Sequence, residues 1–88
     1  MTILVQVTQR DIADGWRGRD ATSANSPIGL ALLRALVAAG RPPGNDLLHE
    51  RNRILHELKG DLAAATRLWT AKWDRREAVQ PWQFEVEV

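Results

Sequence analysis

Residues 26–40 read SPIGLALLRALVAAG, and this stretch decides the fold because it encodes a helix together with both of its ends. Ser26 is a typical N-cap residue, and Pro27 suits the first helical position, where its missing backbone donor costs nothing. Gly40 can adopt the left-handed conformation that ends a helix. Apolar residues cover almost the whole helical surface and Arg34 is the one charge, so we expect the rest of the chain to enclose this helix almost completely.

Two strands are predicted on either side of this helix in the sequence. Residues 3–7 read ILVQV and place their β-branched residues on one side of an extended chain. Residues 82–88 read WQFEVEV, in which apolar residues alternate with polar ones. Glu85 and Glu87 fall on the solvent-exposed face of this strand, where they would discourage edge-to-edge aggregation. Neither strand would be stable alone, so we predict one antiparallel sheet that contains both.

Two further helices are predicted around this core. Thr8 and Asp11 have the spacing of a capping box, and the short helix that they begin would end at Gly15. Residues 62–78 form the second clear helix, with Asp61 as its cap and with Trp69, Trp73 and Leu68 on or beside its core face. The predicted fold class is therefore α+β, as a single domain of residues 1–88. Its small sheet packs against the central apolar helix and the tryptophan-bearing helix.

Residues 47–58 are ambiguous. Their leucines and Ile54 fit one helical stripe, with Asp46 as the cap and Gly60 as the stop. The competing interpretation is a hairpin, in which DLLHE and RILHEL are strands joined at Arg51 and Asn52. Periodicity favours the helix, but both interpretations stay open.

Residues 15–25, GWRGRDATSAN, are predicted to form a loop because glycine, aspartate, serine and asparagine favour turns. Loops of this length in small domains are often functional. Trp16 could fold back over the core beside Trp69 and Trp73. Alternatively, Trp16 could project toward a partner with Arg17 and Arg19, since tryptophan and arginine concentrate binding energy at interfaces.

Composition restricts the class of protein. The 88 residues carry a net charge of +1, which lacks the positive excess of a typical nucleic-acid binder. There is no cysteine, so no disulfide framework or thiolate metal site is expected. We see no signal peptide and no stretch near the ~20 apolar residues of a membrane span, so a cytoplasmic protein that contacts no membrane is predicted.

The residues that usually carry chemistry form no recognisable constellation. His49 and His56 are seven positions apart, which on a helix separates them by about 10.5 Å along the axis, too far for one metal ion. On a hairpin they could be neighbours, but no third ligand is defined. The chain contains no phosphate-binding glycine loop, nucleophile elbow or zinc-protease motif. We therefore predict no enzyme activity, no metal and no cofactor.

Three motifs resemble a group of small uncharacterised bacteriophage and prophage proteins. They are I-x-V-x-V-T at residues 3–8, S-P-I-G-L-A-L at residues 26–32, and W-x-x-x-W-D-x-x-x-x-V-x-P-W-x-F-E-V at residues 69–86. Similar proteins often carry a cysteine pair just before the proline. Here Ser23 and Ser26 occupy those positions, so any metal or redox role of that pair is lost. The resemblance implies an extended middle segment and transfers no catalytic residue.

Two functions follow as hypotheses. The first is a non-enzymatic interaction protein of a phage or mobile element, which binds a host or phage protein and is a candidate inhibitor of a bacterial defence complex, like an anti-CRISPR protein. The second is a nucleic-acid-binding accessory protein whose arginines, Arg10 included, converge near one end. A homo-oligomer is compatible with either. The candidate partner-binding residues are Trp16, Arg17, Arg19, Arg75 and Arg76.

Overall fold

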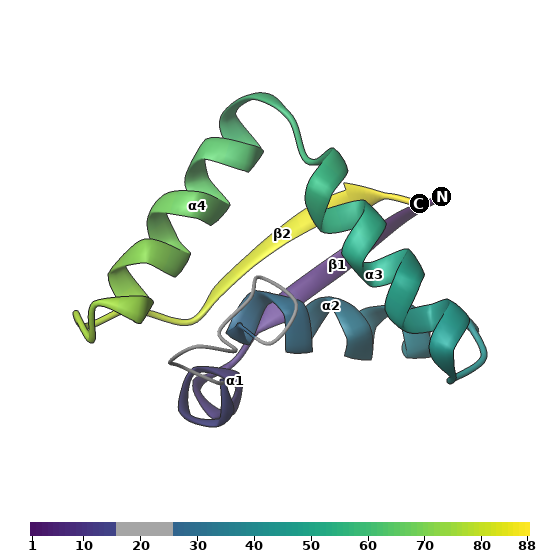
Figure 1. Cartoon of the computed structure of the whole chain (residues 1–88), viewed down its shortest axis with the longest axis horizontal. Coiled ribbons are helices and arrows are strands. Elements are labelled where there is room, and N and C mark those ends of the chain that lie inside the picture. The colour runs from purple at the N-terminus through teal and green to yellow at the C-terminus, as the bar shows by residue number, and fades with distance from the viewer. Residues whose placement is uncertain (16–25) are drawn as a thin grey trace.

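A computed structural model of the chain describes residues 1–15 and 26–88. Its elements follow the order β1 (Thr2–Val7), α1 (Gln9–Asp14), α2 (Pro27–Ala38), α3 (Asn45–Glu57), α4 (Gly60–Asp74) and β2 (Trp82–Glu87). The two strands pair antiparallel, with β2 on the side of α4 and β1 on the side of α1 and α2 (Figure 1). The predicted α+β architecture, with both strands in one antiparallel sheet, is confirmed.

The register of the sheet explains why the strands alternate between apolar and polar residues. Ile3 lies opposite Val86, Val5 opposite Phe84 and Val7 opposite Trp82. These pairs face the helices, and Val5 is fully buried. The residues that alternate with them along each strand are exposed. The sheet therefore has one apolar face and one solvent-exposed face, as the sequence pattern predicts.

Helix α2 begins and ends where the sequence signals place it. The Gly29 backbone N–H donates to Ser26 Oγ at 3.2 Å, and Pro27 is the first helical residue. At the other end Gly40 has a φ of 93°, and the Arg41 N–H donates to the carbonyl of Leu36. These are the bonds of a left-handed helix cap, which only glycine adopts without strain.

Helix α2 contacts β1, α1, α3 and α4, so it lies at the centre of the packing. Leu32 and Leu36 are buried on the face that meets these elements. The expected enclosure is incomplete, because the Val37 side chain is 47% exposed. Val37 lies about 100° around the helix from Leu36, beyond the surface that the described elements cover.

Residues 45–57 are helical, so the hairpin interpretation of this region is wrong. Leu47, Arg51 and Ile54 are spaced to share one face of α3, and all three are buried. The helix places these three positions on one side, and α3 packs against α2. The helix starts after Gly44, and Asp46 lies in its first turn instead of capping it.

Helix α4 differs from the prediction at both ends. Lys59 is its N-cap and no side chain bonds there, so Asp61 lies in the first turn. Gly60 opens α4 instead of ending α3. The helix stops at Asp74, four residues before the predicted end, because Arg76 adopts a left-handed conformation with a φ of 63°.

The junction of α1, α2 and α4 is tightly packed around Trp73. Its side chain is buried, as predicted, and its indole N–H donates to the carbonyl of Ile12 at 3.0 Å. Gly15 follows α1 here, where a Cβ atom would lie 2.7 Å from both Pro27 Cδ and Trp73 Cζ2. Glycine is therefore required at position 15 for close approach and not for its backbone angles.

Candidate functional site

An apolar cleft of about 340 Å³ lies between α4 and the start of β2. Leu68 lines the cleft with 57% of its surface exposed, while the indoles of Trp69 and Trp82 are half-buried. Lys72 is the one charged residue lining it among those that the structure describes. The lining residues are Ala65, Leu68, Trp69, Lys72, Gln80, Pro81 and Trp82.

Two segments that are separate in the sequence build this cleft. Ala65, Leu68, Trp69 and Lys72 recur every three to four residues along one side of α4. The segment that leads into β2 supplies the other wall. The indole N–H of Trp69 donates to the carbonyl of Gln80 at 3.1 Å, which ties the helix to that wall. This hydrogen bond therefore joins the two walls of the cleft.

The tryptophans of α4 thus divide between two roles. Trp73 is a core residue, as the sequence predicts, whereas Trp69 both touches the core and lines the cleft. Leu68 lies beside these residues, as expected, but it is exposed and lines the cleft instead of joining the core. The signal that could have identified the cleft is this leucine, which widens the apolar arc of α4 beyond what the core can cover.

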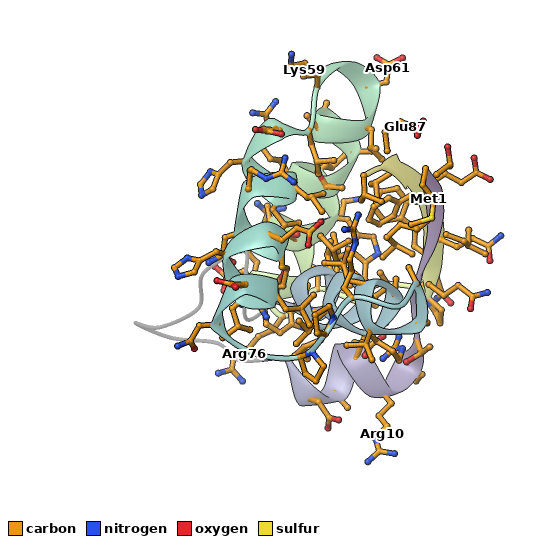
Figure 2. All side chains as sticks on the ribbon, turned by 90° about the vertical axis from the view of Figure 1, so that its right-hand side faces the viewer. Met1, Arg10, Lys59, Asp61, Arg76 and Glu87 are labelled. Carbon is orange, nitrogen blue, oxygen red and sulfur yellow. The ribbon has the colours of Figure 1, made fainter. Side chains whose placement is uncertain are left out.

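The predicted arginines at the end of α4 have different surroundings. Arg75 Nε lies 2.6 Å from Glu77 Oε2 in an exposed ion pair. Arg76 is exposed and forms no ion pair within the described part of the chain. Arg10 lies toward the same end of the molecule as Arg76 (Figure 2), and its Nε is 3.4 Å from Asp14 Oδ2. Trp16, Arg17 and Arg19 lie outside the described residues.

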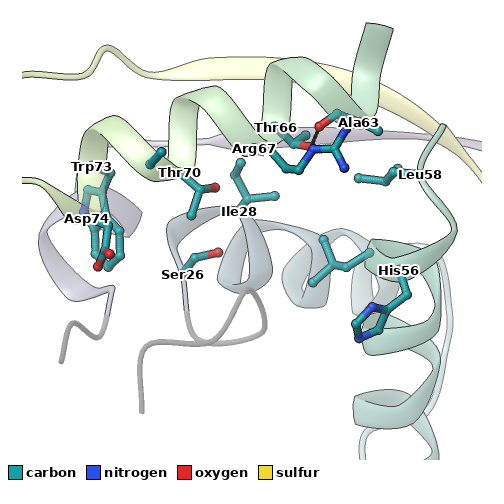
Figure 3. Close-up of a pocket in the computed structure, with 12 residues that line it drawn as sticks. Ser26, Ile28, His56, Leu58, Ala63, Thr66, Arg67, Thr70, Trp73 and Asp74 are labelled. Carbon is teal, nitrogen blue, oxygen red and sulfur yellow. Dashed lines mark hydrogen bonds between the residues drawn. The ribbon is translucent and has the colours of Figure 1, made fainter. Parts of the chain in front are cut away.

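A second hollow, of about 460 Å³, is lined by α2, the end of α3 and α4 (Figure 3). Its walls mix apolar side chains with polar ones. His56 and Asp74 lie at opposite ends of the hollow. The Thr66 hydroxyl donates to the Ala63 carbonyl at 2.9 Å within α4. His56, Thr66 and Asp74 do not converge on a common point.

The histidines remain apart on α3, as the helical interpretation implies. His49 and His56 are both exposed. Over residues 1–15 and 26–88, no three histidine, aspartate or glutamate side chains are grouped closely enough to hold a metal ion. A search of the same residues found no helix that is both long and apolar enough to cross a membrane.

The most strongly bonded polar group of the described chain is Asp11, at the junction of β1, α1 and α2. Its carboxylate accepts two hydrogen bonds from Arg34, at 2.8 and 2.7 Å, and one from the Thr8 backbone at 2.8 Å. Burial raises the pKa of Asp11, but the bonds from Arg34 and Thr8 and the charge of Arg34 outweigh burial and leave the pKa below its ordinary value. The sequence predicted the bond to Thr8 but not the arginine, which lies 23 residues away.

Comparison with known proteins found no matching family model, no matching curated protein and no matching solved structure.

Proposed function

We propose that this protein is a non-enzymatic protein-binding module and that the cleft between α4 and β2 is its contact surface. The observation that carries the proposal is the exposure of Leu68 beside the indoles of Trp69 and Trp82. Solvent-exposed apolar surface is costly to leave open, and contiguous patches of it commonly mark interaction sites. Tryptophan is also among the residue types that contribute most binding energy at interfaces.

The cleft is suited to receive an apolar side chain of a partner. An inserted leucine or phenylalanine would remove its own surface and that of Leu68 from water, which is the main source of affinity in such contacts. Because the hydrogen bond to Gln80 already holds Trp69, little side-chain entropy is lost when the partner binds. Lys72 lies at the rim, where a charge affects orientation and association rate more than affinity.

The partner is, by this proposal, a host or phage protein in the bacterial cytoplasm. The resemblance of residues 3–8, 26–32 and 69–86 to small phage and prophage proteins supports this narrower statement. Inhibition of a bacterial defence complex is one function within this class.

Nucleic-acid binding is the competing function. Arg10 and Arg75 each have an acidic neighbour within ion-pair distance, which reduces the positive charge that they offer to phosphates. Binding to single-stranded DNA that weakens steeply with added salt would favour this function over the proposed one.

The proposal is tested by replacing Leu68 with serine in an affinity capture from a bacterial lysate, read by mass spectrometry. Leu48→Ser is the matched control, because Leu48 is also exposed but lies on α3. We expect Leu68→Ser to weaken capture of the partner by ten-fold or more, about 1.4 kcal/mol, with an unchanged melting temperature. If both variants capture the same protein equally well, the cleft is not the contact surface.

A further inference from the structure

We propose that the partner docks as an extended segment that pairs with the free edge of β2, and that this segment carries basic residues beside Glu85 and Glu87. The inference rests on the proposed function, because it names the kind of partner that the cleft region receives. Strand addition to an exposed sheet edge is a common mode of peptide recognition, in which backbone bonds give affinity and side-chain pockets give specificity.

Hydrogen bonding in the sheet identifies which backbone groups are free. Met1 and Val88 exchange both of their backbone bonds, at 2.8 and 3.0 Å, so they are a hydrogen-bonded pair. In an antiparallel ladder such pairs alternate with pairs whose backbone groups point outward. The outward-pointing groups on β2 therefore belong to Gln83, Glu85 and Glu87.

The two edges of the sheet differ in what covers them. On β1, the Gln6 carbonyl already accepts a bond from Arg34 Nη2 at 2.8 Å, and α2 packs closely against this strand. On β2, the outward residues are exposed, and no described residue bonds to their backbone groups. Helix α4 does not run its backbone close along β2. The backbone groups at the edge of β2 are thus available to another strand, whereas the edge of β1 is partly occupied by Arg34 and α2.

The free edge is continuous with the cleft. Trp82 is the first residue of β2 and also lines the cleft. A strand added to β2 would direct alternate side chains toward the face that bears Trp82. One apolar side chain near the end of that strand would then reach the cleft beside Leu68 and Trp69. Backbone pairing and side-chain insertion can therefore be made by one segment.

The charge on the solvent-exposed face of β2 indicates which kind of strand can pair with it. Glu85 and Glu87 lie on the solvent-exposed face of the sheet, and neither forms an ion pair with any of the described residues. A second copy of β2 would bring glutamates close to glutamates across the new pairing, which is unfavourable. Lysine or arginine on the solvent-exposed face of the added strand would pair favourably instead. The surface fits a foreign strand that alternates basic and apolar residues, and it disfavours self-pairing.

The test uses a synthetic peptide of about ten residues, the length of a long strand, in which lysine alternates with valine and one valine is replaced by leucine. Two matched peptides carry glutamate in place of lysine, or N-methyl groups on alternate backbone nitrogens. We expect the lysine peptide to bind and to slow hydrogen exchange at the amides of Gln83, Glu85 and Glu87. The N-methylated peptide should lose at least ten-fold in affinity because it lacks the pairing donors.

The variant Glu85→Lys completes the test, since Glu85 is exposed and its replacement should leave the melting temperature unchanged. It should weaken the lysine peptide about five-fold and strengthen the glutamate peptide. No binding, or equal binding of all three peptides, would overturn the inference. If protein capture depends on Leu68 but not on Glu85, and N-methylation has no effect, strand pairing is wrong while the proposed function stands. A wild-type chain that dimerises through β2 would also contradict the inference.

Discussion

Asp11 connects three elements through one carboxylate. It accepts a hydrogen bond from the backbone N–H of Thr8, the N-cap of α1, and another from Arg34 of α2. Arg34 in turn donates to the carbonyl of Gln6 on β1. Asp11→Asn keeps the shape but removes the charge, so we expect the free energy of unfolding at pH 7 to fall by about 1.5–3 kcal/mol. Denaturant titration measures this loss. A variant as stable as the wild type would show that the charge has no structural role.

The hydrogen-bonded pair of Asp11 and Arg34 also predicts that the free energy of unfolding depends on pH. The pKa of Asp11 is lower in the folded chain than its ordinary value of 3.8, so the folded state favours the ionised form. The stability that this contributes is present above about pH 4 and is lost as the pH falls through the folded pKa. The difference in unfolding free energy between wild type and Asp11→Asn should therefore shrink below pH 4. A difference that stays constant down to pH 2 would contradict this assignment.

Arg76 occupies a position where glycine is usual. Its φ of 63° places it in the left-handed region, while the Glu77 N–H donates to the carbonyl of Lys72 to close α4. Non-glycine residues are strained there by about 1 kcal/mol or more. We expect Arg76→Gly to raise the unfolding free energy by about 1 kcal/mol, measured by denaturant titration. A destabilised variant would mean that the arginine side chain contributes more than its backbone strain costs.

Among the elements, α2 should dominate stability. Leu36 is fully buried, whereas Val37, its neighbour in the same helix, is 47% exposed. Leu36→Ala should cost about 2–5 kcal/mol, as is usual for a buried leucine. Val37→Ala, the control in the same turn, should cost well under 1 kcal/mol. Equal midpoints for the two variants would show that α2 is not the centre of the core.

Elements whose signals are local could be predicted from the sequence. The caps at Ser26, Gly40 and Thr8 act within a few residues, so the bounds of α2 and the start of α1 follow from them. The strands follow from simple alternation. Residues 47–58 could not be settled, because short apolar runs fit either a helix or a hairpin until α2 provides a surface to pack against. Gly60 was misplaced because glycine occurs at either end of a helix.

The cleft depends on the whole molecule, which is why the sequence did not reveal it. The sequence pattern alone predicts that Trp69 is a core residue. Its second role depends on the Gln80–Pro81 segment, which lines the cleft beside α4 and accepts the hydrogen bond from Trp69. The Asp11–Arg34 pair was missed for the same reason, since its partners meet only after β1 and α2 pack together. Contacts between distant segments, rather than local propensity, set both features.

By our proposal, the molecule binds another protein through the cleft between α4 and β2. The most direct measurement is photo-crosslinking with a photoreactive phenylalanine analogue placed at position 68, and at position 48 on α3 as the control. We expect position 68 to form a covalent adduct with one partner protein in a bacterial lysate and position 48 to form none. An adduct of the same protein from position 48 but not from 68, or crosslinks to nucleic acid instead of protein, would contradict it.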